Sequence, residues 1–453
     1  MNWIDLLTPK RDQHNKSDMA GDALRSPFEM DYDRVIFSHP FRRLQDKTQV
    51  HPLPEEDFVH TRLTHSLEVS VVGRSLGKRV GQVVIERHPE LKKQHYSFHD
   101  FGAIVAAASL AHDIGNPPFG HAGESAISDF FLHHTESERF KRIVSAREWS
   151  DLTHFEGNAQ GLRILSNKQY QGLKLTFATL AAFTKYPRES QITSVEKGRR
   201  SQKKFGFFQT EKEIFSAIAN ELGLQQVSTN EEDYAWCRHP LAFLVEAADD
   251  ICYGIIDLED GCRLGLVSLE ETVEMLAGIV GDRFDRDKFE QIGSKEEKIG
   301  LLRALAISQL IDECCVAFLD NEEGMMDATF DQALTDVIPS AARLKEISRL
   351  SFAKIYSARN VLETEVVGYE VLPGLLEVIT GAVYGRYIEQ WGNSGKNNSI
   401  FKLLPDTLVL EMDQCAGSAY QLLMLCIDFV SNMTDGNAIS FYRKIKGIDL
   451  PKR

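Results

Sequence analysis

An adjacent histidine and aspartate, His112 and Asp113, end an apolar, alanine-rich segment and precede a Gly-Asn-Pro-Pro turn. Neighbouring residues of a helix point ~100° apart, but at its last turn both side chains can lean toward one point beyond the end. Burying an ionised carboxylate and an imidazole in so apolar a segment is unfavourable unless something compensates. A bound cation would compensate, which makes the pair a candidate metal site. A capping aspartate beside a packed histidine is the alternative interpretation.

Two further segments carry side chains of the same chemistry. His65 lies in the middle of an amphipathic segment, and Asp249 lies in the middle of an apolar one, within Glu-Ala-Ala-Asp-Asp. Because aspartate has a low helix propensity, we expect one of Asp249 and Asp250 to point inward and the other outward. Asp249, Tyr253 and Asp257 are spaced i, i+4 and i+8 and therefore share one helix face. That face suits a pocket wall, and a solvated acidic face is the alternative.

Together these residues offer imidazole nitrogens and carboxylate oxygens from three helical segments. Such a mixed ligand set suits Mn²⁺, Mg²⁺, Fe²⁺ or Zn²⁺, and it leaves coordination positions open for water and for substrate oxygens. The ligands are dispersed along the chain, so their spacing alone does not establish that they converge on one ion. Their convergence is therefore a prediction about the fold.

The segments that would position these residues have helical periodicity. Apolar residues recur on one face of 61–85, residues 101–115 are almost entirely apolar, and 240–261 is bracketed by a proline and a glycine. Alternating strand patterns are scarce, and 366–372 is the best short candidate for a strand. We therefore predict an all-α fold with few short strands.

Polar and glycine-containing stretches suggest how the chain is divided. Residues 187–209 and 391–400 are predicted to be loops. An acidic segment at 270–300 separates the motif-rich part from a plainer helical part. We predict a core that contains the active site over 1–270, and a helical C-terminal region over 271–453 that packs on the core and contributes to oligomer contacts.

The composition, with 43% hydrophobic and 26% charged residues, is that of a soluble globular protein. The formal net charge of −15 disfavours a surface that binds nucleic acid or acidic membrane as a whole, so an anionic substrate would need a locally basic pocket. Seven cysteines, an odd number without a C-x-x-C pair, favour reduced thiols. Because no apolar run reaches ~18 residues and no signal-peptide pattern opens the chain, we expect a cytoplasmic protein without membrane spans.

Four long strings carry a family resemblance: TRLTHSLEV, AHDIGNPPFGHAGE, HFEGNAQGLRIL and LVEAADDICYGIIDLEDG. In this order they resemble the signature blocks of the deoxyguanosine triphosphate triphosphohydrolase family, which belongs to the HD superfamily. The likeness extends upstream to FRRLQDKTQV and downstream to GYEVLPGLLEV and SNMTDGNA, and so covers most of the chain. It implies a central bundle of HD helices, and hydrolysis of a deoxynucleoside triphosphate, dGTP by default, to a deoxynucleoside and inorganic triphosphate.

The resemblance also implies roles for particular residues. The implied metal ligands, with Mn²⁺ or Mg²⁺ expected and Fe²⁺ or Zn²⁺ not excluded, are His65, His112, Asp113 and Asp249. His121 and Glu124 are spaced i, i+3 and lie close together if a helix opens after Pro118. A histidine oriented by a carboxylate can act as a general acid or base. The alternative is that Glu124 is an acid favoured by the helix dipole and His121 only a cap.

Cationic residues for a triphosphate are expected beside these ligands. Arg62 lies one turn before His65 on the same helix face. By resemblance, Lys185, Tyr186 and Lys204 contact the phosphates, and simple solvation is the alternative for both lysines. Neighbouring Arg199 and Arg200 are expected to be solvated.

The sugar pocket is likewise implied by resemblance. Gln49 and Asp257 would lie near the 3′-hydroxyl, and Tyr253 would pack against the deoxyribose, where a ring tight against C2′ excludes a ribose. Asn158 would line the same pocket. The alternatives are an ordinary turn residue for Gln49 and a helix cap for Asn158.

The family is typically oligomeric and often hexameric, so a homo-oligomer is expected. Its C-terminal string commonly has an aromatic residue after Met-Thr-Asp-x, where this chain has Asn437; base preference and allosteric control stay open. Two other functions compete: another HD-type phosphomonoesterase or phosphodiesterase, and a nucleotide-sensing or single-stranded-DNA-binding protein with little turnover. The products of hydrolysis separate the enzymes, and the basic stretch 197–204 keeps DNA contact open.

Overall fold

The computed structural model describes residues 1–12, 25–50, 60–167, 172–228, 230, 232–388 and 395–448. Within these residues the chain is helical and has no β-strand, so the predicted all-α fold is confirmed. Isolated bridges occur, such as the one that pairs Thr48 with Thr61. The predicted strand at 366–372 is wrong, because these residues continue a long helix.

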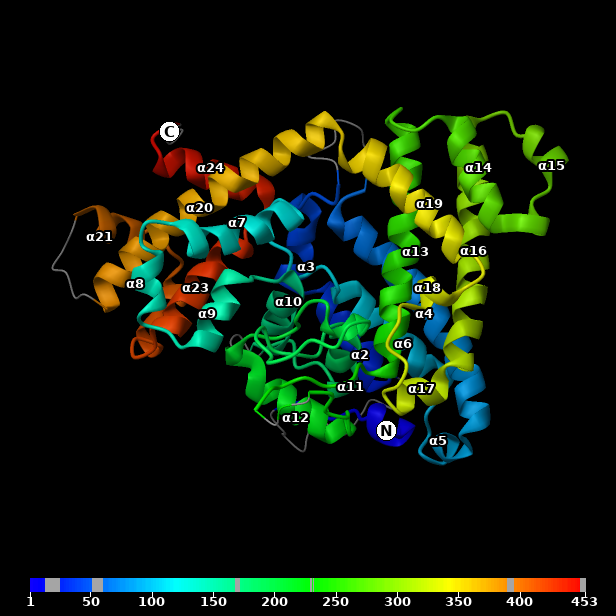
Figure 1. Ribbon diagram of the computed structural model, residues 1–453, viewed down its shortest axis with the longest axis horizontal. Helices are drawn as coiled ribbons and strands as arrows, with labels where there is room; N and C mark the ends of the chain where they lie inside the picture. The colour runs from blue at the N-terminus through cyan, green and yellow to red at the C-terminus, as the bar shows by residue number, and fades with distance from the viewer. Residues whose placement is uncertain are drawn as a thin grey trace.

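The helices follow one another along the chain in the order that Figure 1 shows. The first part of the chain forms α1 (Trp3–Leu6), α2 (Pro27–Ile36), α3 (His39–Arg43), α4 (Arg62–Arg87), α5 (Pro89–Lys93), α6 (Phe98–Ala111), α7 (Gly120–His133), α8 (Ser137–Lys141), α9 (Ala146–Thr153), α10 (Gly157–Ser166), α11 (Phe177–Phe183) and α12 (Lys212–Leu222). The rest forms α13 (Pro240–Arg263), α14 (Leu269–Val280), α15 (Arg286–Glu290), α16 (Lys295–Asp320), α17 (Glu322–Met326), α18 (Leu334–Val337), α19 (Ala341–Ser351), α20 (Arg359–Tyr387), α21 (Gly395–Phe401), α22 (Asp406–Gln414), α23 (Ala419–Ser431) and α24 (Asp435–Ile445).

Two details of this order bear on the predictions. A π-helical turn, Phe352–Tyr356, follows α19 directly and leads toward α20. The predicted loop at 391–400 is wrong from residue 395 onward, where α21 begins, and residues 391–394 lie outside the described part of the chain.

The helices α4 and α6 pack closely because α4 presents small residues to α6. A Cβ added to Gly73 would lie 2.4 Å from the Ser109 hydroxyl, and one added to Gly77 would lie 2.7 Å from the Phe101 carbonyl oxygen. At Gly81 it would lie 2.8 Å from the Phe101 side chain. The helix α13 packs against both of them. Three of the segments that carry candidate ligands are thereby brought together in one bundle.

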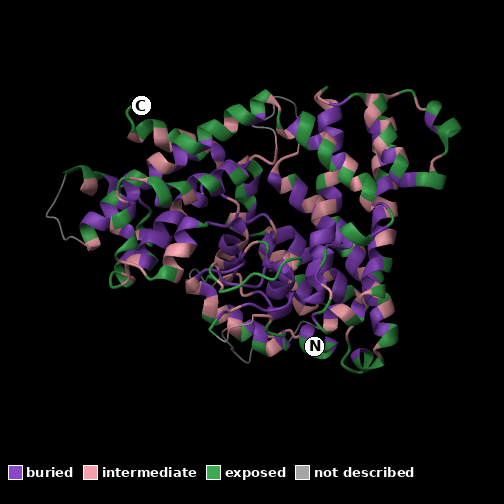
Figure 2. Cartoon of the chain, viewed as in Figure 1, coloured by how far each residue is buried: buried purple, intermediate pink, exposed green. Residues whose placement is uncertain are grey.

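A second group of buried residues is formed mainly by α7 and the C-terminal helices (Figure 2). Here α20 packs against α7, α23 and α24 through buried residues at helical spacing, among them Val371, Leu372, Leu375 and Leu376. The helix α20 is long and apolar enough to cross a membrane by length and composition, but 56% of its most apolar window is buried inside the molecule. Contacts within the protein account for this apolar character.

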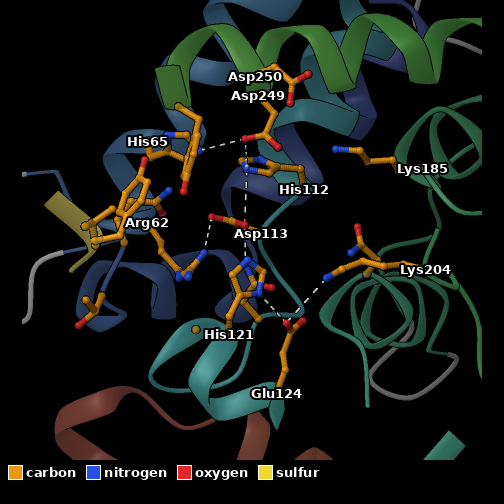
Figure 3. Close-up of a pocket in the computed structure, with 18 of the residues that line it drawn as sticks. Arg62, His65, His112, Asp113, His121, Glu124, Lys185, Lys204, Asp249 and Asp250 are labelled. Carbon is orange, nitrogen blue, oxygen red and sulfur yellow. Dashed lines mark hydrogen bonds and ion pairs between the residues drawn. The ribbon is translucent and has the colours of Figure 1, made fainter. Parts of the chain in front are cut away.

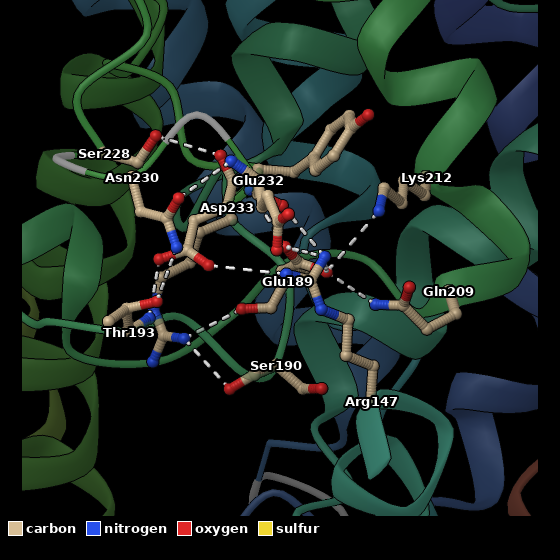
Figure 4. A network of polar contacts seen from close by, with 12 residues as sticks. Arg147, Glu189, Ser190, Thr193, Gln209, Lys212, Ser228, Asn230, Glu232 and Asp233 are labelled. Carbon is tan, nitrogen blue, oxygen red and sulfur yellow. Dashed lines mark hydrogen bonds and ion pairs between the residues drawn. The ribbon is translucent and has the colours of Figure 1, made fainter. Parts of the chain in front are cut away.

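The segment between α11 and α12 lacks regular structure apart from short 3₁₀ turns, as predicted for a loop. It is nevertheless held by the buried carboxylate of Glu189, which pairs with the partly exposed Arg147 (Figure 4). The Glu189 carboxylate accepts hydrogen bonds from Arg147 at 3.2 Å, from the Gln209 side chain at 2.8 Å and from the Tyr234 backbone at 2.8 Å. Since a buried carboxylate with three donors is costly to displace, the basic residues of this segment have defined positions.

Candidate active site

The predicted site residues surround a cavity of about 590 Å³. Its walls come from α4, α7 and α13, from the segment after α11, and from the π-helical turn and the start of α20. The predicted residues that line it are Gln49, Arg62, His65, His112, Asp113, His121, Glu124, Asn158, Lys185, Tyr186, Lys204, Asp249 and Tyr253. The remaining one, Asp257, lies buried behind the wall.

Two histidines and two aspartates meet in this cavity (Figure 3). The Asp249 Oδ1 atom lies 3.4 Å from His65 Nε2 and 3.5 Å from His112 Nε2. His65, His112 and Asp113 each offer one candidate ligand atom, and these three atoms lie within 4.8 Å of one another. Ligands that are ~2.1 Å from a shared ion lie ~3.0–3.4 Å apart at octahedral or tetrahedral angles. The donor set therefore fits a divalent cation, and the separations of Asp249 from the two histidines are close to those of ligands that share one ion.

Neighbouring groups orient these ligands. His112 Nδ1 lies 2.7 Å from the Ser109 carbonyl oxygen, which leaves Nε2 facing the cluster. The Asp113 carboxylate accepts a hydrogen bond from the Asn116 side chain at 2.5 Å and one from Arg62 at 2.7 Å. Asp113 is thus held on both oxygens.

The histidines and aspartates of the cluster stabilise each other's charged forms. Burial alone would lower the pKa of His65, but its hydrogen bond with Asp249 and the nearby carboxylates raise that pKa above its ordinary value. Burial would raise the pKa of Asp249, but His112 and His65 hold it well below the usual range. The pKa of Asp113 is lowered against burial chiefly by the Arg62 guanidinium. The carboxylates are therefore ionised and available to a cation.

The helix α7 begins with two consecutive left-handed residues. Phe119 has a φ of 64°, which is unfavourable for an aromatic residue, and Gly120 has a φ of 57°. Glycine adopts this conformation without the strain that a Cβ would bring, and a Cβ at Gly120 would lie 2.7 Å from the Arg62 guanidinium. This turn directs the start of α7 toward the cavity, where His121 lies.

His121 and Glu124 form the pair that their spacing predicts. His121 Nδ1 lies 2.6 Å from Glu124 Oε2, and the backbone N–H of Gly157 donates to Glu124 Oε1 at 2.6 Å. The Glu124 hydrogen bond raises the pKa of His121, whose side chain is 85% exposed and lines the cavity. Burial would raise the pKa of Glu124, but His121 and Lys204 lower it. The imidazole is thus oriented by a carboxylate and favoured in its protonated form.

Lysines lie on one side of the candidate metal-ligand group (His65, His112, Asp113 and Asp249), opposite Arg62 (Figure 3). Lys204 Nζ lies 2.9 Å from Glu156 Oε1, and Lys185 Nζ lies 3.3 Å from Glu246 Oε1. Burial would lower the pKa of each lysine, but the neighbouring carboxylates raise both values. Both side chains are therefore cations that face the cavity.

The expectation that Arg199 and Arg200 are solvated is wrong. Arg200 lines the cavity and donates to the Glu246 carboxylate at 2.9 Å. Arg199 donates to the Ala328 carbonyl oxygen at 2.8 Å, and its side chain is only 18% exposed. The acceptors lie 46 and 129 residues further along the chain, so a local pattern could not reveal them.

The expected pocket wall on α13 is confirmed only in part. Asp249 and Tyr253 line the cavity, but Asp257 does not, because the Tyr356 hydroxyl donates to its carboxylate at 2.7 Å from the cavity side. The Tyr356 ring stacks on Tyr253 with the ring centroids 5.4 Å apart. Burial raises the pKa of Asp257 to about 7. Asp250 also lines the cavity, so the prediction that one of the paired aspartates points outward is wrong.

Two polar side chains lie on the other walls of the cavity. The Oε1 atom of Gln49 is buried and has no hydrogen-bond partner among the described residues. Asn158 donates to Glu156 Oε1 at 2.7 Å rather than capping a helix through its side chain. Gln49 therefore offers an unsatisfied acceptor, which is costly unless a ligand supplies a donor.

Comparison with known proteins gives a consistent result. A family model, the HD domain, matches residues 62–160. A deoxyguanosinetriphosphate triphosphohydrolase-like protein of Synechocystis is 40% identical over 99% of this chain and 100% of its own length. A protein of the same description from Pseudomonas aeruginosa is 39% identical over 100% of both chains. A deoxyguanosinetriphosphate triphosphohydrolase of Yersinia pestis is 32% identical over 78% of this chain and 76% of its own. The chain belongs to the deoxyguanosinetriphosphate triphosphohydrolase family.

Family membership confirms the resemblance of the sequence strings, and the structure adds what lies outside the HD match. The matched range contains His65, His112 and Asp113 but ends before Asp249. Residues that the sequence did not single out also line the cavity, namely Thr48, Val50, Asn116, Lys203, Glu246, Phe352, Tyr356, Val361, Thr364 and Glu365. Of these, Thr48, Val50, Asn116 and Glu246 lie inside the quoted strings and could have been found from them.

Proposed function

We propose that the protein is a metal-dependent hydrolase of deoxynucleoside triphosphates, with dGTP as the default substrate, that releases a deoxynucleoside and inorganic triphosphate. The observation that carries this proposal is the convergence of His65, His112, Asp113 and Asp249 in a cavity with lysines on one side. A cavity of about 590 Å³ is of the size that holds a small-molecule ligand. Relatives named for dGTP hydrolysis support the substrate class.

The proposed cofactor is a divalent cation, Mn²⁺ or Mg²⁺, although the same ligand types also bind Fe²⁺ or Zn²⁺. The two imidazoles and two carboxylates of the cluster would hold it. When bound, such an ion polarises a phosphate oxygen and makes a bound water more nucleophilic.

The triphosphate would bind to the cationic side of the cavity. Lys185, Lys204 and Arg200 are paired with the carboxylates of Glu156 and Glu246 in the structure. A triphosphate carries more negative charge than these carboxylates and would compete for the same cations. Arg62 on the opposite side would stay with Asp113 and orient that ligand.

His121 would supply a proton to the leaving group. In the proposed reaction a water oxygen bonds to the α-phosphorus, the bond from that phosphorus to the 5′-oxygen breaks, and the proton that the attacking water loses passes to the solvent. The departing 5′-oxygen then needs a proton, and a protonated His121 can donate it. Glu124 would balance the charge of the imidazolium and fix its orientation through the 2.6 Å hydrogen bond.

The deoxyribose would lie between Gln49 and the stacked rings of Tyr253 and Tyr356. The unpartnered Oε1 atom of Gln49 would accept a hydrogen bond from the 3′-hydroxyl. Tyr356 occupies the part of the cavity wall where Asp257 was expected. The Tyr356 hydroxyl would therefore face the sugar, and its hydrogen bond to the buried Asp257 carboxylate would fix its position. The Tyr253 ring would leave no room for a 2′-hydroxyl.

The assembly and location are part of the same proposal. We expect a homo-oligomer, with a hexamer as the first state to test, to which the region 271–453 contributes contacts. The seven cysteines form no disulfide within the described chain, which is consistent with a cytoplasmic protein.

An analysis of reaction products tests the proposal. The purified protein is incubated with Mn²⁺ or Mg²⁺ and, separately, with dGTP, each other dNTP and GTP, and the products are separated by ion-exchange chromatography. We expect a deoxynucleoside and triphosphate from dGTP and much less product from GTP. Asp113→Ala removes a proposed ligand and should abolish turnover.

Other outcomes would assign other functions. Orthophosphate or pyrophosphate as the product would indicate another HD-type phosphomonoesterase or phosphodiesterase. If neither a single nucleotide nor a mixture of nucleotides is hydrolysed, the proposal is wrong, and nucleotide and single-stranded-DNA binding become the functions to measure, the latter as a function of salt.

A further inference from the structure

One buried carboxylate connects the C-terminal helices to the active-site turn. Asp435 is the first residue of α24 and is 3% exposed. Its Oδ1 atom accepts the backbone N–H of Phe119 at 3.1 Å, and its Oδ2 atom accepts the backbone N–H of Thr48 at 3.0 Å. Because both donors are main-chain groups, this side chain fixes the path of the backbone at two places beside the cavity.

A buried lysine makes a second connection in the same place. Lys47 is 3% exposed, and its Nζ atom donates to the Asn116 carbonyl oxygen at 2.6 Å and to the Ser431 carbonyl oxygen at 3.0 Å. Two points of the turn before α7 are thus bound to two points of the α23–α24 connection. The short stretch at residues 47 and 48 runs between them.

This turn carries groups on which the site depends. The Asn116 side chain donates to the proposed metal ligand Asp113, and His121 follows the left-handed pair at Phe119 and Gly120. A left-handed phenylalanine persists only where its surroundings over-determine it. The helix α20 leaves room for it, since a Cβ at Gly368 would lie 3.0 Å from the Phe119 side chain. The strained turn is therefore stabilised by the C-terminal helices.

We propose that Asp435 is a positioning residue of the active site, with Lys47 as its support. It holds the turn so that His121 and Glu124 face the metal-ligand group, and it holds Thr48 so that the adjacent Gln49 faces the sugar. What those groups do for the substrate rests on the proposed function, whereas the clamp itself does not. Neither Asp435 nor Lys47 lines the cavity, so both act through other residues.

Amide hydrogen exchange tests the clamp without substrate. In Asp435→Asn the carboxamide keeps one acceptor and presents an N–H₂ group to the other backbone donor. We expect faster exchange in peptides that cover 113–124 and 41–50. The matched control is Asp428→Asn, the same change in α23, where the carboxylate accepts from Arg163 of α10 instead. This control should leave exchange in both peptides unchanged.

Steady-state kinetics tests the consequence. Misplacement of catalytic groups by a fraction of an ångström costs about tenfold or more in rate, so Asp435→Asn should lower kcat for dGTP by about tenfold or more and change KM by much less. Asp435→Glu, which restores two acceptor oxygens, should recover part of the loss. The melting temperature of each variant is measured as well, to check that it is folded under the assay conditions.

The outcomes separate the two proposals. Unchanged exchange at 113–124 in Asp435→Asn overturns the clamp, and so does an equal loss of kcat in Asp435→Asn and Asp428→Asn. If the wild-type protein hydrolyses no dNTP while exchange still rises only in Asp435→Asn, the proposed function fails and the clamp stands.

Discussion

The protonation of His121 depends chiefly on the carboxylate of Glu124. The Glu124 carboxylate accepts from His121 with one oxygen and from the Gly157 backbone with the other, so it cannot rotate away. The other charged groups that face His121 are Lys204 and Arg62, which lower its pKa, and Glu124 outweighs them. The carboxylate therefore sets the pH at which this histidine loses its proton.

Glu124→Gln should shift the alkaline limb of the pH–rate profile to lower pH. If protonated His121 is the general acid, activity falls as the pH rises through its pKa, and Glu124 raises that pKa. Glutamine removes the charge, so the loss of activity should begin nearer the ordinary histidine pKa of ~6.5. The measurement is kcat/KM for dGTP from about pH 5.5 to 9, where a lost general acid also costs ~10²–10⁴-fold in rate.

His121→Asn is the companion variant, because it should remove the limb altogether. An alkaline limb that stays in place in Glu124→Gln, or that moves to higher pH, would assign the ionisation to another group.

The residues of the site differ in how far the sequence could predict them. The proposed ligands lie in contiguous strings, so their types and order could be recognised, and the structure brings them together. The sugar end could not be predicted in the same way. Tyr356 covers Asp257 from 99 residues further along the chain, and this contact depends on a π-helical turn that no local pattern announces.

At the scale of the elements, periodicity predicted the long helices and failed on one short run. Residues 366–372 alternate well enough to suggest a strand, yet they belong to α20. A run of seven residues fits both the helical and the strand periodicity, so only the residues that follow it can distinguish a helix from a strand. The next apolar residues, Leu375, Leu376 and Ile379, extend a buried helical face against α7 and α23.

Asp151 in α9 joins three elements through one buried carboxylate. It accepts hydrogen bonds from the hydroxyls of Ser190 and of Tyr420 in α23, and from the Gln209 backbone at 2.7 Å. Burial raises the pKa of Asp151 to about 7, with Glu211 adding to it and the hydrogen bonds opposing it. This junction holds α9, the basic segment and the C-terminal helices together.

Asp151→Asn should make the stability of the protein less dependent on pH. The folded-state pKa lies above the unfolded value of ~3.9, so the stabilisation from the protonated carboxyl is fully present at low pH and is lost as the pH rises through about 7. Asparagine stays neutral throughout. Relative to the variant, the wild type should lose melting temperature between about pH 4 and 7.

Thermal unfolding at a series of pH values measures this difference. Asp413→Asn is the matched control, because Asp413 accepts a tyrosine hydroxyl, that of Tyr387, at an exposed position. The same pH dependence in both variants and in the wild type would show that Asp151 is ionised in the folded state at every pH tested.

On the scale of the whole molecule, the net charge of −15 opposes the binding of any polyanion. Basic residues in the cavity compensate for this charge locally. Four basic residues lie on one side of the cavity, whose lining also includes several carboxylates: Lys185, Arg200, Lys203 and Lys204. A divalent cation at His65, His112, Asp113 and Asp249 would neutralise part of that negative charge and tie α4, α13 and the end of α6 to one point. Metal and fold should therefore be linked.

Removal of divalent metal should lower the melting temperature, and Mn²⁺ should restore it. A ligand that binds only the folded state stabilises it by ~2.7 kcal/mol at a hundred times its Kd, which corresponds to a rise of a few degrees. Asp113→Ala and Asp249→Ala should each lose most of this response, because each removes a carboxylate of the cluster. Asp413→Asn, which alters an exposed carboxylate that does not line the cavity, should keep it. If the melting temperature of the wild-type protein does not change with Mn²⁺ up to millimolar concentration, the protein does not bind the cation that the proposed chemistry requires.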